Sequence, residues 1–203
     1  MELLPVLDLL STLVFALVGA RIAADKGLDY GGITFIAAVA SVSGGTLRNV
    51  FLGLNPVWIS DPWIIVMVLS AVLMTLVFRR VTRIGKTLLV MDTFGLAIAT
   101  ISGSYLAFQQ NVTWQAAIIL GLITAVTGGL LRDVLCQVEP VLLHRETIGT
   151  SSLMGAITFV CLHQLQVNET TSAVAGAAIV VITRILSIYF DLHLPKFNKQ
   201  KNP

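Results

Sequence analysis

Seven long apolar stretches, joined by short polar connections, leave this chain few ways to fold. They cover about residues 3–23, 31–53, 62–80, 87–108, 113–136, 147–166 and 170–190. Each is close to the roughly 20 apolar residues that a helix needs to cross a bilayer. Charged residues are only 12% of the chain, about half their share in an ordinary soluble domain. The sequence therefore predicts an all-α polytopic membrane protein with seven transmembrane helices.

The first half of the chain recurs in the second half at an offset of 84 residues. Asp8 corresponds to Asp92, and VSGGTLRNV at 42–50 corresponds to VTGGLLRDV at 126–134. An acid, a glycine pair and an arginine recur in the same order, which indicates an internal duplication. We expect repeat one at about 3–80, repeat two at about 87–166, an extra helix at about 170–190 and a basic tail at 195–203.

Each repeat holds three spans, so the second copy must enter the membrane from the opposite side. This is an inverted repeat, related by a pseudo-two-fold axis in the membrane plane, with a seventh helix added at the end. The second and fifth spans are then expected to cross or face each other near the midplane. This architecture is found in proteins that move solutes.

Basic residues gather on one side of the predicted membrane arrangement. That side receives the first, third and fifth connections and the tail, and it carries eleven of the thirteen Lys and Arg residues: Arg21, Lys26, Arg79, Arg80, Arg83, Lys86, Arg132, Arg145, Lys196, Lys199 and Lys201. The positive-inside rule makes this side cytoplasmic. We expect the N-terminus outside and the C-terminus inside. The net charge of +2 is too small to indicate a nucleic-acid partner.

Two adjacent glycines lie inside each of the second and fifth spans, as Gly44-Gly45 and Gly128-Gly129. One interpretation is close packing of helices along a face of small residues. The other is that the pairs kink and break their helices, exposing backbone carbonyls beside a cavity. The recurrence at one offset favours the second interpretation.

Broken helices would offer oxygen ligands to a dehydrated cation. The sequence therefore predicts a monovalent cation site at the backbone carbonyls near Gly44 and Gly128, with hydroxyls added by Ser43 and Thr127, which stand just before the pairs.

An arginine stands a few residues beyond each glycine pair, within an apolar run. Arg48 and Arg132 could snorkel to the headgroups, but each repeat also supplies an acid at a matching depth. Because a charge in the membrane core costs roughly 2.5–3.5 kcal/mol on insertion scales, we predict two ion pairs related by the repeat. These are Asp8–Arg48 and Asp92–Arg132.

The repeat is imperfect directly after the arginines, where Asn49 corresponds to Asp133. Neighbours in sequence do not face each other on a helix, so Asp133 is expected to be a poor partner for Arg132. Two interpretations of Asp133 stay open: it draws cations toward the cytoplasmic mouth, or it is an interfacial residue.

Residues 42–56 and 126–140, within a seven-span inverted repeat, resemble the prokaryotic trimeric intracellular cation (TRIC) channels, which are also grouped under a glycine-transporter domain name. The resemblance implies a bacterial inner-membrane homotrimer. It also implies a pore within each protomer between the second and fifth helices, kinked at their glycines. Potassium or sodium would permeate, no cofactor would be needed, and Arg48 and Arg132 would lie at the pore.

Three classes of function compete at this point. A monovalent cation channel fits the resemblance, whereas inverted repeats alone lean toward a secondary transporter of glycine or another small zwitterion. An enzyme is disfavoured, because the spans carry no His-Glu metal pattern, Ser-His-Asp set or paired-carboxylate site. Unitary currents without added solute would favour the channel, and saturable glycine uptake would favour the transporter.

Overall fold

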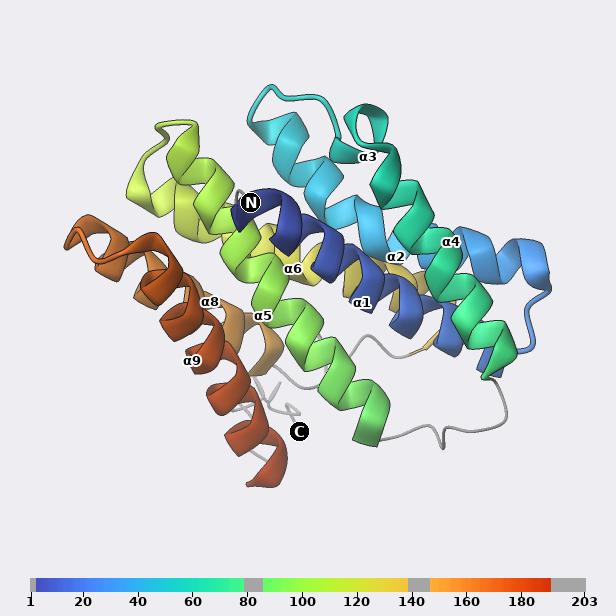
Figure 1. Ribbon diagram of the computed structural model, residues 1–203. Coiled ribbons are helices and arrows are strands. Elements are labelled where there is room, and N and C mark those ends of the chain that lie inside the picture. Colours follow the sequence, from blue (N-terminus) through green and yellow to red (C-terminus); the bar gives the residue numbers. More distant parts are fainter. Residues whose placement is uncertain (1–2, 79–85, 139–146, 191–203) are drawn as a thin grey trace, which may run out of the picture.

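The computed structural model describes residues 3–78, 86–138 and 147–190, and within these ranges every regular element is a helix (Figure 1). The helices are α1 (Leu3–Asp25), α2 (Tyr30–Phe51), α3 (Val57–Ser60), α4 (Pro62–Val77), α5 (Lys86–Gln109), α6 (Trp114–Leu135), α8 (Thr147–Gln164) and α9 (Glu169–Tyr189). The expected basic tail lies outside the described residues.

Each of the seven predicted windows contains one helix, and side-chain caps explain several of the starting points. Asp29, Thr113 and Asn168 each accept a hydrogen bond from a backbone N–H in the first turn of α2, α6 and α9. Such caps satisfy donors that the helix itself leaves without a partner. The four-residue helix α3 was not predicted, because a single turn in a connection has no apolar periodicity.

Five of the described helices are long and apolar enough to cross a membrane: α1, α2, α5, α6 and α9. The apolar helix α4 has 16 residues, and its predicted window extends into residues 79–80, outside the described ranges. Helix α8 has 18 residues and is not among the five. The chain is thus an all-α membrane protein in which five of the seven expected spans meet this measure of length and apolarity.

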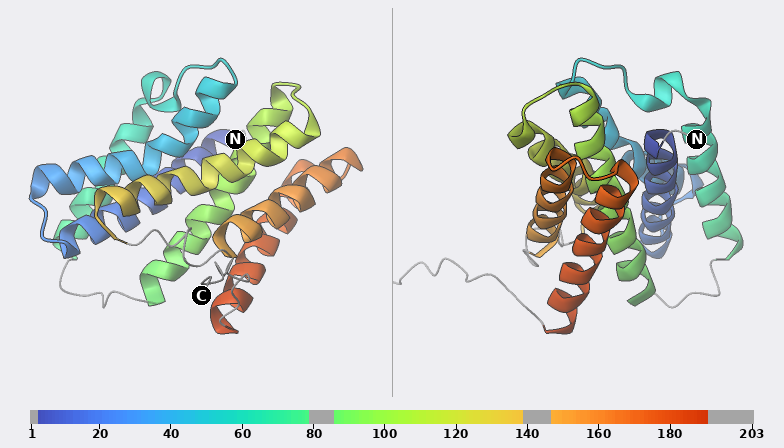
Figure 2. Two further views of the ribbon diagram at one scale, coloured as in Figure 1. Left: turned by 180° about the vertical axis from the view of Figure 1, so that it is seen from behind. Right: turned by 60° about the vertical axis from the view of Figure 1, so that its left-hand side comes forward.

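The two repeats run in opposite directions. Helices α1 and α5 are antiparallel in Figure 1, and α2 and α6 are antiparallel in the left view of Figure 2. Within the first repeat α1 packs against α2 and α4, and within the second α5 packs against α6 and α8. The repeats meet where α2 packs on α6 and α1 on α5, while α9 covers α5 and α8. The inverted repeat with one added helix is therefore present.

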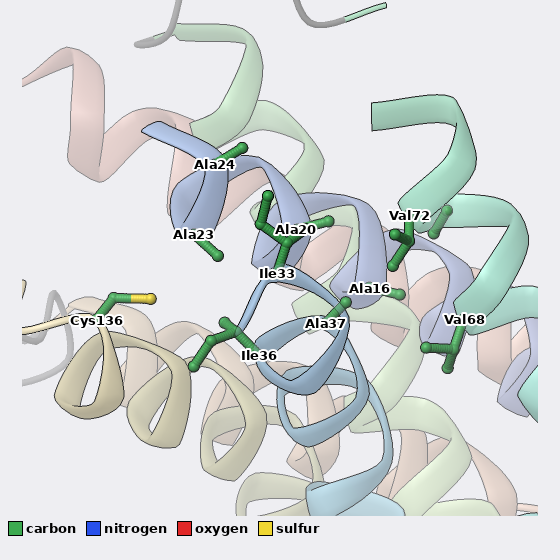
Figure 3. Close-up of a cluster of buried hydrophobic side chains, with 11 residues drawn as sticks. Ala16, Ala20, Ala23, Ala24, Ile33, Ile36, Ala37, Val68, Val72 and Cys136 are labelled. Atoms are coloured by element: carbon green, nitrogen blue, oxygen red, sulfur yellow. The ribbon is translucent and has the colours of Figure 1, made fainter. Parts of the chain in front are cut away.

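Small side chains allow the helices of the first repeat to lie close together. Ala16, Ala20 and Ala23 on α1 are fully buried against α2 and α4 (Figure 3). Helix α2 contributes Ala37 to the same cluster, and Cys136, just beyond α6, fills its edge. Because lipid tails are as apolar as these side chains, close van der Waals packing rather than water exclusion holds such helices together.

Helices α2 and α6 cross at one glycine of each pair. A Cβ on Gly44 would overlap the backbone carbonyl oxygen of Thr124, and a Cβ on Gly128 would overlap that of Ala40. Both helices continue through their glycine pairs without interruption. The expected break is therefore wrong: these glycines allow two backbones to touch. The ribbon of α2 does change direction along its length (Figures 1 and 2), but a kink at the glycines stays a prediction.

Candidate functional site

Arg48 lies in a polar cluster near the C-terminal end of α2, and each nitrogen of its guanidinium group has a hydrogen-bond partner. Its Nη1 and Nη2 atoms each lie 3.0 Å from an oxygen of Asp8 on α1, so the ion pair is bidentate. Nη1 also donates to Oγ of Ser102 on α5 at 2.7 Å, and that hydroxyl in turn donates to Asp8. The arginine side chain is 0% exposed, and bidentate pairing of this kind suits a desolvated guanidinium. The predicted Asp8–Arg48 pair is present.

Arg132 has the equivalent place near the C-terminal end of α6. Its Nη1 donates to Asp92 on α5 at 2.7 Å, so the second predicted pair is also present. Its Nε donates to Asp133 at 2.9 Å. The expectation that Asp133 would be a poor partner was wrong, because the long arginine side chain folds back beside its own helix. Asp133 is buried within the protein, and both interpretations of its role, attraction of cations and placement at the membrane interface, stay predictions.

The residue after each arginine accepts a hydrogen bond from the Nε atom of that arginine, but this residue is neutral in the first repeat and anionic in the second. Nε of Arg48 donates to Oδ1 of Asn49 at 2.9 Å, as Nε of Arg132 does to Asp133. Asn49 also donates to the carbonyl of Asn55 at 2.7 Å, which ties the connection after α2 to the cluster. The first cluster thus combines one cation with one carboxylate, and the second combines one cation with two.

A small cavity lies beside each arginine. The cavity of the first repeat has a volume of about 30 Å³ and is lined by Gly45 and Arg48. The cavity of the second repeat, about 20 Å³, is lined by the corresponding Gly129 and Arg132. The second glycine of each pair therefore faces a cavity, whereas the first glycine makes the helix crossing, and in the first repeat Gly44 also lines the cavity.

Phe15 on α1 lines both of these cavities and is 4% exposed. It therefore stands between the space beside Arg48 and the space beside Arg132. The residue corresponding to it in the second repeat is Ala99, which lines only the first of the two cavities. Sequence analysis missed Phe15, because a phenylalanine in an apolar span carries no signal of its own.

A larger cavity of about 340 Å³ opens at the second cluster, with Asp92, Arg132 and Asp133 in its lining. Val18 also lines it, and Val18 is the counterpart of Ser102. Where the first cluster has a hydroxyl that closes its hydrogen-bond network, the second has an aliphatic side chain. The two arginine clusters therefore differ in charge and in the size of the cavities beside them.

The remaining predicted site residues have other surroundings. Thr127 donates its hydroxyl to the carbonyl of Ile123 at 2.6 Å, and Ser43 lies near the α2–α6 crossing. Neither residue lines the three cavities described above. Because an uninterrupted α-helix uses its carbonyls in its own hydrogen bonds, the expected cation site at the carbonyls near Gly44 and Gly128 loses the broken helices on which it depended.

Comparison with known proteins places these features in a wider group. A family model described as Glycine transporter matches residues 5–80 and again residues 89–164, one match for each repeat. The chain is 32% identical over 200 residues to the inner membrane protein YadS of Escherichia coli (strain K12), with 97% of each chain covered.

Two solved structures are similar in sequence and in fold. One is the TRIC trimeric intracellular cation channel orthologue from Rhodobacter sphaeroides, which is 31% identical with a TM-score of 0.89 and covers 95% of this chain and 100% of its own. The other, described as a structural basis for conductance through TRIC cation channels, is 32% identical with a TM-score of 0.85 and covers 98% of both chains.

Proposed function

Because this chain belongs to the Glycine transporter family and has the fold of the TRIC channels, we propose that it is a channel for monovalent cations, potassium or sodium. The related structures of similar fold are described as cation channels. Within this chain, the observation that carries the proposal is the succession of polar clusters and cavities from one end of the bundle to the other.

The proposed path begins in the large cavity beside Asp92 and Asp133 and reaches the small cavity of the second repeat at Arg132. It continues past Phe15 into the small cavity of the first repeat and ends at Arg48. Two paired arginines and one aromatic ring interrupt this route, so this conformation represents a closed channel. Opening requires that each guanidinium and the ring move aside.

The route differs from the one expected between the second and fifth spans. The backbones of α2 and α6 touch at Gly44 and Gly128, which leaves no passage between them at that point. The small cavities lie beside the crossing, where α1 and α5 complete the walls with Phe15 and Asp92. We therefore place the ion path along one face of the α2–α6 pair.

Assembly and orientation follow the relatives and the charge pattern. We propose a homotrimer in the inner membrane of a bacterium, because the Rhodobacter sphaeroides orthologue is described as trimeric and YadS as an inner membrane protein. The excess of Lys and Arg on one side of the predicted spans places the N-terminus outside and the C-terminus in the cytoplasm.

The description of the matching family favours a second candidate, transport of glycine. Under this proposal the zwitterion would occupy the large cavity, with its carboxylate toward Arg132 and its ammonium group toward Asp133. A transporter requires that both mouths open in turn. A channel requires only that a continuous hydrated path opens.

Reconstitution separates the two candidates. Purified protein in planar bilayers with unequal K⁺ and Na⁺ on the two sides should give unitary currents, and the reversal potential should report the more permeant ion. The same preparation in vesicles should show no saturable uptake of labelled glycine. Glycine uptake without current steps would replace the channel proposal with the transporter.

A further inference from the structure

We propose that the small cavity of the first repeat binds one partly dehydrated monovalent cation through the hydroxyl oxygens of Ser11, Thr12, Ser41 and Thr46. All four side chains line this cavity, which lies directly beside Arg48. The inference rests on the proposed channel function and adds to it a residue-level site of ion selection. In this proposal the ion is bound by side-chain hydroxyls, and not by the helix carbonyls that the sequence led us to expect.

Three of the four hydroxyl groups, those of Ser11, Ser41 and Thr46, present acceptors to the cavity because their hydrogens are already used. Oγ of Ser11 donates to the carbonyl of Asp8 at 3.1 Å, and Oγ of Ser41 donates to that of Ala37 at 2.8 Å. Oγ1 of Thr46 donates to its own helix at 2.7 Å and accepts from Nε1 of Trp58 at 3.1 Å, which leaves one of its lone pairs for a ligand. A hydroxyl has one hydrogen and two lone pairs. Once the hydrogen bonds a backbone carbonyl, only oxygen lone pairs remain to meet a ligand.

The charges around the cavity favour a monovalent cation over other ions. Calcium and magnesium prefer carboxylate ligands, and both oxygens of Asp8, the carboxylate in this lining, are held by Arg48. An anion would need donors, but all three nitrogens of Arg48 donate to Asp8, Asn49 or Ser102. Neutral oxygens of moderate field strength are the ligands that potassium channels also use.

The size of the cavity requires that the ion lose most of its water. A cavity needs about 10–15 Å³ to hold one water molecule, so a volume of about 30 Å³ has room for about two waters, or for one ion with one water. A complete hydration shell does not fit. Selection among ions then depends on how well the hydroxyl oxygens replace the lost water.

The second repeat supplies an internal comparison, because its cavity has the same place but not the same chemistry. Leu96 corresponds to Thr12, Ala125 to Ser41 and Leu130 to Thr46, and all three line the cavity of about 20 Å³ beside Arg132. Duplication therefore gave two cavities, and only the first is lined by hydroxyl groups. We therefore expect the path to select among ions at the cavity of the first repeat and not at that of the second.

The site is tested by replacing its hydroxyls and locating a heavy analogue of potassium. Crystals of the full-length protein grown in RbCl should show an anomalous Rb⁺ peak in the first cavity, and the Thr12→Val/Ser41→Ala double variant should lose it. In bilayers the same variant should change the K⁺/Na⁺ permeability ratio by about two- to tenfold, the range expected for losing one or two neutral ligands.

Two further variants control for general damage. Thr34→Val removes another α2 hydroxyl that donates to a helix carbonyl, that of Tyr30, from a half-buried position outside the cavity, and should leave the peak and the ratio unchanged. Thr12→Ser keeps the oxygen and should retain both. If the double variant does not fold, each single variant is measured against Thr12→Ser.

The outcomes distinguish the site from the channel. A Rb⁺ peak that depends on Thr12 and Ser41, in a protein that carries no current, would support the site and reject the channel. Currents with an unchanged permeability ratio and no Rb⁺ peak would reject the site and keep the channel. An anomalous bromide peak in this cavity would also overturn the proposal, because it would show a site for anions.

Discussion

At the scale of single residues, the two buried arginines differ in what would remain if one partner were lost. Arg132 has two carboxylates within hydrogen-bond distance, Asp92 and Asp133. Arg48 has one, Asp8, and its other partners are the neutral side chains of Asn49 and Ser102. A buried charge without a counter-ion is strongly destabilising. The two pairs therefore look alike in geometry but are not equivalent in energy.

Neutralising the acid of each pair should reveal this difference. We expect Asp8→Asn to lower the free energy of unfolding by about 3–5 kcal/mol, the cost of leaving a buried charge unpaired. Asp92→Asn should cost about 1–3 kcal/mol, because Asp133 still faces the guanidinium. Unfolding of both variants in detergent micelles measures the two losses. Equal losses, or a greater loss at Asp92, would contradict the unequal pairing.

Sequence reasoning could predict the ion pairs but not everything around them. Asp8 and Arg48 lie at matching depths in neighbouring spans, and the second repeat shows the same relation, so the pairing is visible in the chain itself. The contact between Arg132 and Asp133 depends on a side-chain conformation that no spacing rule describes. Ser102 and Phe15 act through tertiary contacts with another helix, and their residue types are common in membrane spans.

At the scale of helices, the two glycines of each pair have separate tasks. Gly44 and Gly128 allow α2 and α6 to touch, whereas Gly45 and Gly129 face the small cavities. A Cβ at Gly45 or Gly129 would meet only the end of the neighbouring arginine, at 3.9 Å and 3.6 Å. Repetition of the motif favoured a break in the sequence analysis, but the motif alone could not distinguish a crossing from a break.

Alanine at each glycine should separate these tasks. Gly44→Ala and Gly128→Ala place a methyl group on a backbone carbonyl, and we expect each to cost about 1–3 kcal/mol or more through overpacking. Gly45→Ala and Gly129→Ala should change stability little, because the added carbon finds space. Thermal unfolding of the four variants tests this order. A larger loss at Gly45 than at Gly44 would indicate that local backbone freedom matters more than the crossing.

At the scale of the whole molecule, the position of Phe15 makes the closed path unsymmetrical. Two cavities related by the repeat are separated by one ring from the first copy, and the second copy has Ala99 at the corresponding position. The seven long helices, their order and their inverted arrangement could all be predicted from apolar length and the offset of 84 residues, whereas the short helix α3 could not. The place of the barrier could not, because it depends on how the two copies interlock.

Removing the ring should join the two small cavities. We expect Phe15→Ala to raise the unitary K⁺ conductance in planar bilayers, because hydrophobic constrictions obstruct ions by excluding water. The variant should also lose about 3–5 kcal/mol of stability, as is usual for a buried Phe→Ala change. Phe159→Ala is the matched control: Phe159 is equally buried among Tyr105, Phe108 and His163, so stability should fall without a gain in conductance.

If Phe159→Ala raises the conductance as much as Phe15→Ala does, loosening of the bundle explains the effect and the ring is not the barrier.

The difference between Asn49 and Asp133 also determines how a membrane voltage acts on the protein. A two-fold axis in the membrane plane reverses directions along the membrane normal, so the dipoles of the two arginine–aspartate pairs point oppositely and a uniform field exerts cancelling forces on them. Asp133 has no anionic twin in the first repeat. A full charge crossing the membrane at 100 mV gains about 2.3 kcal/mol. Within the two arginine clusters, the part of that energy that does not cancel belongs to Asp133. One carboxylate thus gives an electrical polarity to two clusters whose ion pairs would otherwise cancel.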